Sequence, residues 1–298
     1  MFIAKNYKLF TILTLALIIM AIASAAYFGL HYGIDFTGGS ILEVSYTKER
    51  PTSALLNLEL NKLDLGQTVL QETDNNGIVL RARDLKPEER VAVLSALSAN
   101  GKYIMTEKSF DSIGPVIGSE LKRKALWGVT LVILLIVLYI TFAFRKVSLP
   151  VASWKYGLIA VGTLVHDIIV PTGFYAIWTY YNGGEVDILF VTALLAILGF
   201  SIHDTIIVFD RIRENLRLSS GREPFLEIVG KSLSQTFARS INTSLTVVIV
   251  LGALLFVGPA ATHNFALLLI VGIIAGTYSS IFFASPLLII AEGLQKKR

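Results

Sequence analysis

The sequence predicts a membrane protein, an all-α bundle of six transmembrane helices with a small α+β domain inserted after the first helix. Two observations predict this class. Of the 298 residues, 54% are hydrophobic and only 16% are charged, whereas an average soluble domain has about 25% charged residues. Six apolar segments are also long enough to cross a bilayer, which takes about 20 helical residues. Lipid must therefore cover much of the surface.

The first element is an apolar run at residues 9–30, which follows Lys5 and Lys8. The apolar core of a signal peptide is shorter, at about 7–15 residues. We therefore predict a retained transmembrane helix within residues 1–30. Cleavage near Ala23-Ser24-Ala25, a run of small residues, is the alternative.

Residues 31–123 follow as a polar insert in which strand and helix patterns alternate. Strand patterns occur at 40–46, 67–73, 77–83 and 103–109, and helical patterns at 51–63 and 87–99. The turn composition of Asp74-Asn75-Asn76-Gly77 joins the two middle strands into a hairpin. The resulting order β-α-β-β-α-β is typical of a ferredoxin-like domain. The insert has no acid cluster or phosphate-binding loop, so we expect no catalysis in it.

Five further apolar segments form a transmembrane domain over residues 124–298. They lie at 124–144, 151–178, 187–209, 236–257 and 265–291, and a basic loop at 210–235 separates the third of them from the fourth.

Basic residues are distributed unequally between the two sides of the predicted membrane domain. They follow the second and fourth spans and the last one: Arg145, Lys146, Arg211, Arg213, Arg217, Arg222, Lys231, Lys296, Lys297 and Arg298. The loops at 179–186 and 258–264 contain no lysine or arginine. Because basic loops stay in the cytoplasm, both termini are predicted to be cytoplasmic and residues 31–123 extracytoplasmic.

Asp204 is an acidic residue near the cytoplasmic end of the fourth span. A carboxylate in such a segment costs about 2.5–3.5 kcal/mol on insertion scales, so it needs a partner or a task. Ser201 lies one turn earlier on the same helical face, and His203 is adjacent and could titrate near neutral pH. Asp204 is therefore the first candidate for a functional residue.

A polar stripe begins at Arg239 in the fifth span. Asn242, Thr243 and Thr246 follow at spacings of three, four and seven residues, which places them on one helical face. Arg239 and Asp204 lie at comparable depth in consecutive antiparallel spans, so they could meet, as in the proton relays of pumps. The alternatives are a purely structural ion pair, an arginine that reaches the interface, and hydroxyls that serve helix packing.

His166 and Asp167 form an acid–base pair in the middle of the third span. Structural pairing to Lys155 or to a hydroxyl and a role in transport chemistry are both open at this stage.

Enzyme motifs are absent from the sequence. It contains no His-Glu-x-x-His, no Gly-x-Ser-x-Gly, no nucleotide-binding Gly-x-x-x-x-Gly-Lys-Ser/Thr and no cysteine. We therefore expect no enzymatic activity, no metal or cofactor, and no nucleic-acid partner. An ion gradient remains as the energy source.

Several motifs together resemble one family along the whole chain. They are Gly33–Gly39 (GIDFTGG), Ser112–Gly118 (SIGPVIG), His166-Asp167, Gly199–Asn215, Ala238–Ser244 (ARSINTS) and Tyr278–Phe282 (YSSIF). The chain resembles the SecF branch of the SecD/SecF family, within the resistance-nodulation-division superfamily.

The resemblance implies a partner subunit, SecD, and action at the SecYEG channel of the bacterial cytoplasmic (inner) membrane. There the proton-motive force would help to complete preprotein export. By position, Asp204 resembles the proton-carrying acid, with Arg239 and Thr243 as its partners, while His203 stands where many members have asparagine. Coupling to sodium instead of the proton stays open.

Two other functions are compatible with these features. The first is a half-transporter for lipids or drugs of the same superfamily, although such proteins are usually much longer. The second is a passive export chaperone in which the buried charges form only a structural ion pair.

Overall fold

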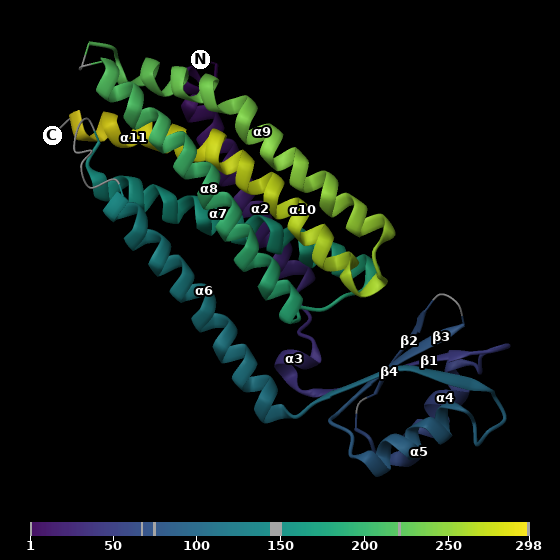
Figure 1. Cartoon of the computed structure of the whole chain (residues 1–298). Coiled ribbons are helices and arrows are strands. Elements are labelled where there is room, and N and C mark those ends of the chain that lie inside the picture. The colour runs from purple at the N-terminus through teal and green to yellow at the C-terminus, as the bar shows by residue number, and fades with distance from the viewer. Residues whose placement is uncertain (1, 67, 74–75, 144–150, 220–221, 297–298) are drawn as a thin grey trace. The chain divides into compact units, whose positions relative to one another are not determined.

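The computed structural model describes residues 2–66, 68–73, 76–143, 151–219 and 222–296. Arg145, Lys146, Lys297 and Arg298 of the basic stretches, and Asp74-Asn75 of the predicted turn, lie outside these ranges. The chain divides into two compact units (Figure 1). Met1–His31 and Trp127–Arg298 form a helical unit, and Tyr32–Leu126 form an α+β unit.

Six helical segments of the described chain are long and apolar enough to cross a membrane, as predicted. The first five are α2 (Tyr7–Phe28), α6 (Pro115–Ala143), α7 (Ser153–Asn182), α8 (Ile188–Ser219) and α9 (Phe225–Val257). The sixth consists of α10 (His263–Ser279), a π-helical turn η3 (Ser280–Ala284) and α11 (Ser285–Lys296). A short helix, α1 (Phe2–Lys5), precedes α2.

The predicted basic loop at 210–235 is mostly helical, because α8 continues to Ser219 and α9 already begins at Phe225. Ion pairs three residues apart support the extension of α8 beyond its apolar part. Arg211 pairs with Glu214, and Arg213 pairs with Asp210. Pairs at this spacing stabilise an exposed helix, so the charged residues extend the helix instead of ending it.

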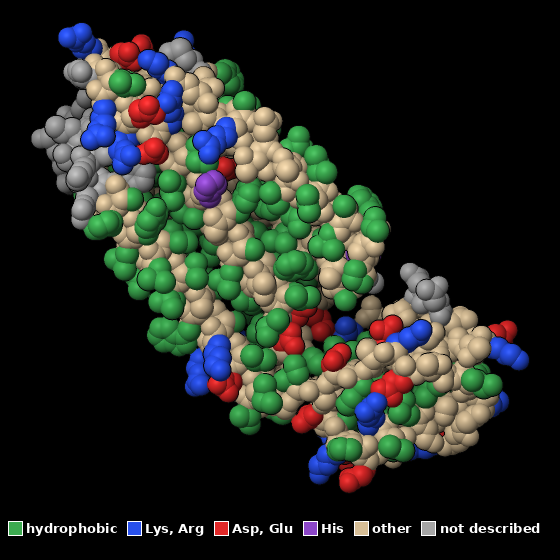
Figure 2. Space-filling view, in the orientation of Figure 1, with side chains coloured by type: hydrophobic (Ala, Val, Ile, Leu, Met, Phe, Trp, Pro, Cys, Tyr) green, Lys and Arg blue, Asp and Glu red, His purple; other side chains and the backbone are tan. Residues whose placement is uncertain are grey.

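Within the helical unit, α10 packs against α7, α8 and α9, while α2 packs against α7. The apolar stretches of α7 and α8 are half buried, whereas only 11%, 6% and 17% of those of α2, α6 and α9 are buried. Figure 2 shows hydrophobic side chains along the sides of this unit and charged ones at the end that carries both termini. The exposed apolar flanks identify a multi-pass membrane protein.

The α+β unit contains four antiparallel strands in the order β2-β3-β1-β4. Its elements are α3 (Ile34–Thr37), β1 (Gly39–Tyr46), α4 (Ser53–Leu60), the 3₁₀ turn η1 (Asn61–Leu63), β2 (Val69–Thr73), β3 (Gly77–Ala82), α5 (Pro87–Leu97) and β4 (Met105–Ile113). Alternate residues of β1, namely Leu42, Val44 and Tyr46, are buried, and they share one core with residues of α4 and α5 such as Leu56 and Val93. The period of two in β1 therefore orients one face of the sheet toward the helices.

Glu89 fixes the start of α5, where Pro87 occupies the first turn. Its carboxylate accepts a hydrogen bond from the Arg83 guanidinium at 2.6 Å and another from the backbone N–H of Lys86 at 2.9 Å. The Arg83 bond and then the Lys86 amide lower the pKa of Glu89 to about 2. The helix start is thus capped by an ionised side chain throughout the neutral range.

The chain enters the sheet of the α+β unit through Gly38 and Gly39 and leaves the sheet toward Pro115, and these two segments are in contact. Gly38 has φ +74° and ψ 162°, a backbone region that is essentially restricted to glycine. A Cβ atom on Gly38 would lie 2.7 Å from the Cα of Pro115, and one on Gly118 would lie 2.8 Å from the backbone nitrogen of Gly38. The glycine doublet is therefore a close backbone crossing against the first turn of α6.

Candidate functional site

The carboxylate of Asp204 on α8 is fully buried in the helical unit. Its Oδ2 atom accepts a hydrogen bond of 3.4 Å from the hydroxyl of Thr277 on α10. Thr277 is also hydrogen-bonded to the hydroxyl of Ser244 on α9, so three helices meet here. The Oδ1 atom has no hydrogen-bond partner among the described groups. A buried acceptor left in this state costs about 1–3 kcal/mol, so Asp204 is held under-satisfied.

A second carboxylate, that of Asp167 on α7, is buried in the same bundle. Its Oδ1 atom lies 2.7 Å from Nδ1 of His166. Its Oδ2 atom accepts hydrogen bonds from the hydroxyls of Ser201 on α8 and Ser279 on α10, the latter at 3.0 Å. Asp167 is thus held from three helices and is better satisfied than Asp204.

The α8–α10 contact depends on a small residue. A Cβ atom on Gly276 of α10 would lie 2.9 Å from the Cβ of Ser201. Glycine at this position lets the helices approach closely enough for Ser201 and Ser279 to reach Asp167, in line with the use of small residues at membrane helix contacts. Immediately after Ser279 the helix becomes a π-turn, η3, a feature that often occurs at functional sites.

Gly276→Ala is expected to destabilise the helical unit, because the added methyl group must push α10 away from Ser201. Overpacking of this kind costs about 1–3 kcal/mol, which thermal unfolding in detergent would detect as a lower midpoint. Gly199→Ala on α8 is the matched control, since a Cβ there has no neighbour within 4 Å. Equal midpoints for the two variants would contradict the close contact.

The polar stripe predicted on the fifth span lies on α9 but does not reach Asp204 within this chain. Arg239, Asn242 and Thr246 are exposed. The hydroxyl of Thr243 donates to the backbone carbonyl of Arg239 at 2.9 Å, and that of Thr246 to Asn242 at 2.8 Å. The hydrogen bond to Asp204 comes from Thr277 instead. Whether the stripe reaches Asp204 depends on the rotation of α9 about its axis. The spacing of residues in the sequence does not define that rotation.

The remaining predicted residues divide into two groups. Ser201 donates to Asp167, which also contacts His166, so the pair is bonded to a hydroxyl, one of the two partners that the sequence allowed. His203 is exposed on α8. Lys155 does not pair with Asp167, because its Nζ atom donates to the carbonyl of Ala291 at 3.1 Å. The hydroxyls of Ser201 and Ser279 pair with Asp167 instead.

Sequence reasoning missed the donors on α10 and α9. Thr277, Ser279 and Ser280 are fully or nearly fully buried on α10 and η3, and Ser240 and Ser244 are buried on α9. A signal was present, because a run of hydroxyls in an otherwise apolar span is unusual. It carried no information about which carboxylate each hydroxyl would meet.

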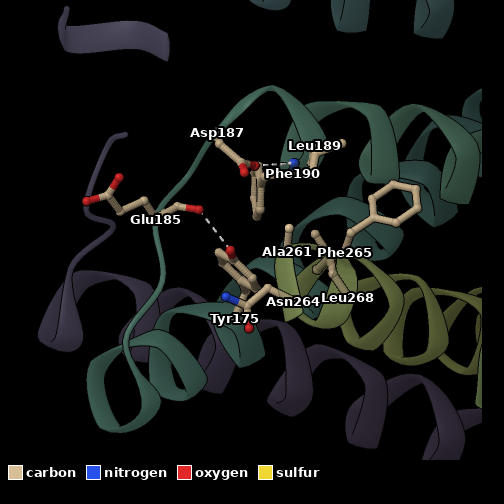
Figure 3. Close-up of a pocket in the computed structure, with 9 residues that line it drawn as sticks. All are labelled: Tyr175, Glu185, Asp187, Leu189, Phe190, Ala261, Asn264, Phe265 and Leu268. Atoms are coloured by element: carbon tan, nitrogen blue, oxygen red, sulfur yellow. Dashed lines mark hydrogen bonds between the residues drawn. The ribbon is translucent and has the colours of Figure 1, made fainter. Parts of the chain in front are cut away.

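A separate cavity of about 60 Å³ lies at the other ends of the helices, where α7 ends and α8 and α10 begin. Figure 3 shows Tyr175 donating to the carbonyl of Glu185, at 2.8 Å, and the side chain of Asp187 at the start of α8. Asp187 accepts a hydrogen bond from the backbone N–H of Phe190 at 2.7 Å and so caps the helix. The cavity is about 25 Å from Asp204 along α8, so it is not part of the carboxylate site.

The site lacks the composition of a metal centre. In the part of the chain that the structure describes, no three His, Cys, Asp or Glu residues cluster as metal ligands would. Two buried carboxylates, one imidazole and several hydroxyls remain, and these are groups that hold and pass protons. The fold and the site define a multi-pass membrane protein whose helix bundle buries ionisable groups and which carries an additional α+β unit.

Comparison with known proteins identifies the family within this class. The model described as "Protein export membrane protein SecD/SecF, C-terminal" matches residues 93–293, and the "SecD/SecF GG Motif" matches residues 28–49. The chain belongs to the SecD/SecF family.

Individual relatives are similar over nearly the full chain. The protein translocase subunit SecF of Thermobaculum terrenum is 42% identical, over 94% of this chain and 90% of the relative. That of Anaerolinea thermophila is 38% identical, over 97% of this chain and 93% of the relative. The crystal structure of SecDF from Thermus thermophilus, described as a translocon-associated membrane protein, matches with a TM-score of 0.82 and 32% identity. The match covers 99% of this chain but only 38% of that chain.

Proposed function

We propose that this chain works with SecD as the SecF-type subunit of a complex that assists preprotein export through the SecYEG channel. The main support for this proposal is the match of nearly the whole chain to about two-fifths of a translocon-associated SecDF chain. The rest of that chain would correspond to SecD. We infer that the complex lies in the bacterial cytoplasmic membrane, with both termini of this chain in the cytoplasm.

The exposed polar stripe supports a partner within the membrane. Arg239, Asn242 and Thr246 lie on a helix whose apolar side chains are mostly exposed. Contact of a guanidinium with lipid is costly, so a second protein covering this face of α9 accounts for its composition. SecD is the partner that the family comparison favours, and lipid covers the apolar remainder.

The α+β unit is proposed to be a ferredoxin-like domain on the extracytoplasmic side. Its support is the strand order β2-β3-β1-β4 together with the element order β1-α4-β2-β3-α5-β4. This side of the membrane is where an emerging preprotein would be met.

The proposed energy source is the proton-motive force, with Asp204 as the residue that takes up and releases the proton. Asp204 is buried and one of its oxygens lacks a partner among the described groups, so it has an unfilled position for a proton or a donor. Arg239 and Thr243 are proposed to complete the relay once SecD encloses the α9 face. Ser201, His203, Asn242 and Thr246 are auxiliary polar groups in this scheme.

A reconstituted export assay tests the proposal at the level of the whole protein. In vesicles that contain SecYEG and SecD, adding this chain is expected to make late export depend on an imposed proton gradient, and a protonophore should remove the stimulation. The measurement is the amount of preprotein protected inside the vesicles over time.

Other outcomes of that assay favour other functions. Stimulation by a sodium gradient alone would replace the proton as the coupling ion, and stimulation without any gradient would indicate a passive chaperone. Purification without SecD and SecYEG, combined with movement of lipid or drug, would indicate a half-transporter.

A further inference from the structure

A second ionisable pair lies in the bundle and has no role in the scheme above. His166 and Asp167 on α7 have no exposed surface, and Nδ1 of His166 lies 2.7 Å from Oδ1 of Asp167. The imidazole stacks against Tyr278, and its Nε2 atom is buried without a hydrogen-bond partner among the described groups. The pair is therefore buried away from water, and one of its polar atoms, Nε2 of His166, makes no hydrogen bond to the described groups.

In the part of the chain that the structure describes, the elements packed against α7 bring no lysine or arginine close to this pair. On α7 itself, Lys155 is about 18 Å away along the helix axis and donates to the carbonyl of Ala291. On α11, Glu292 lies about 20 Å beyond Ser279 along the helix axis. Among the described residues of α8, Asp204 and the exposed His203 lie near its level, because Ser201, which donates to Asp167, precedes Asp204 by one turn.

The remaining neighbours of α7 contribute no close charge either. On α2, Lys8 is about 9 Å along the helix from Thr14, which contacts the hydroxyl of Tyr278 at 3.2 Å. Tyr278 is the ionisable group of α10 at this level, and the sequence of η3 contains none. Among the described residues, His166 is thus the group that can balance a charge on Asp167 directly.

This arrangement favours a single proton in the pair. With one proton the pair has no net charge, whether as imidazolium and carboxylate or as imidazole and carboxylic acid. Losing that proton leaves one negative charge on the pair in an apolar interior, which is unfavourable and so favours uptake of one proton.

One helix connects this pair to the Asp204 site. On α10, Thr277 donates to Asp204 at 3.4 Å and Ser279 donates to Asp167 at 3.0 Å. Residues two apart point about 200° apart on a helix, so α10 lies between the two carboxylates and binds both. The π-turn begins directly after Ser279, which makes this the point where the helix hydrogen bonding is irregular.

We propose that His166 and Asp167 form a second proton-binding site, separate from Asp204, and that α10 links the two sites through its donors Thr277 and Ser279. Uptake converts imidazole and carboxylate, which together carry one negative charge, to imidazole and carboxylic acid, which carry none, and it breaks no covalent bond. A protonated Asp167 carboxyl accepts more weakly from Ser201 and Ser279, so uptake loosens α10 from α7, and release restores both hydrogen bonds.

Infrared titration of the full chain with SecD in lipid vesicles tests this inference. With isotopically labelled aspartate, the carbonyl band of a protonated side chain identifies a carboxyl group that gains a proton. In Asp204→Asn we expect a pH-dependent aspartate band that Asp167→Asn in the same background removes. The absence of any such band in Asp204→Asn would overturn the proposal.

A variant that leaves the Asp167 carboxyl in place provides a second measurement in case Asp167→Asn does not fold. Ser279→Ala removes a hydrogen bond that favours the ionised carboxylate, so the midpoint of the band should rise by roughly one pH unit. Thr179→Ala is the control, since that buried α7 hydroxyl donates to its own helix at Tyr175. An unchanged midpoint in Ser279→Ala would contradict the assignment.

The inference rests on the proposed function only for its consequence in export. If the band titrates while Asp204→Asn leaves gradient-dependent export intact, the second site stands and the proposed relay fails. If export loses its gradient dependence but no second band titrates, the relay stands and the second site fails.

Discussion

Asp204→Asn is expected to remove the whole stimulation of preprotein export by a proton gradient in reconstituted vesicles. Asparagine has nearly the same shape and keeps an oxygen that can accept from Thr277, whose bond to Asp204 measures 3.4 Å. It cannot bind or release a proton near neutral pH. The variant therefore isolates the titration of this residue from its packing.

The fold of this variant should be nearly unaffected. An amide of similar volume avoids the cost of burying an unpaired charge, so the unfolding midpoint should not fall. Asp210→Asn on the same helix is the matched control, because Asp210 is exposed and pairs with Arg213; it should leave export unchanged. Full gradient stimulation in Asp204→Asn would refute the relay, and a lower midpoint with intact stimulation would indicate a structural ion pair.

Gly38→Ala is expected to disrupt the α+β unit where the chain enters it. Two independent penalties apply. The backbone at φ +74° and ψ 162° costs a residue other than glycine about 1–3 kcal/mol. The new methyl group would also lie 2.7 Å from the Cα of Pro115, and such overpacking costs about 1–3 kcal/mol more. The sum is a large part of the stability of a small domain.

Two other glycines separate these penalties. Gly29 has almost the same backbone conformation, with φ 74° and ψ 168°, but nothing lies within 4 Å of its Cβ position. Gly118 is helical, and its Cβ would lie 2.8 Å from the nitrogen of Gly38. Gly118→Ala measures the steric penalty within the α+β unit, and Gly29→Ala measures the conformational penalty at the end of α2, by the unfolding midpoint of the helical unit. Proteolysis of the α+β unit in the full chain should rise most in Gly38→Ala and less in Gly118→Ala, and rates equal to that of the unchanged protein would contradict the close contact.

Most of the fold could be predicted from local patterns. Apolar length identifies the six spans, because a helix must satisfy its own backbone groups inside lipid. In the α+β unit, the alternation at Leu42, Val44 and Tyr46 identifies β1 as a strand with one buried face. Helix ends were less predictable. The charged end of α8 remains helical through its own ion pairs, which a hydropathy pattern does not register.

The candidate site could be predicted only in part. A carboxylate in an apolar span has high energy wherever it points, so Asp204 and Asp167 are recognisable without a structure. The identity of their partners depends on the rotation of each helix about its axis and on how closely neighbouring helices approach. Gly276 permits the contact that brings Ser201 and Ser279 to Asp167.

The sequence by itself determined the class of protein, the number of spans, the family resemblance and the two buried acids. These follow from composition and from periods along one chain, which are local properties. Only the tertiary structure decided that Arg239 faces outward, that Thr277 reaches Asp204, and that α10 binds both carboxylates. The physical reason is that a buried polar group is satisfied by whichever donor the packed helices bring within hydrogen-bond distance. Thr277 lies 73 residues from Asp204 along the chain, and Ser279 lies 112 residues from Asp167.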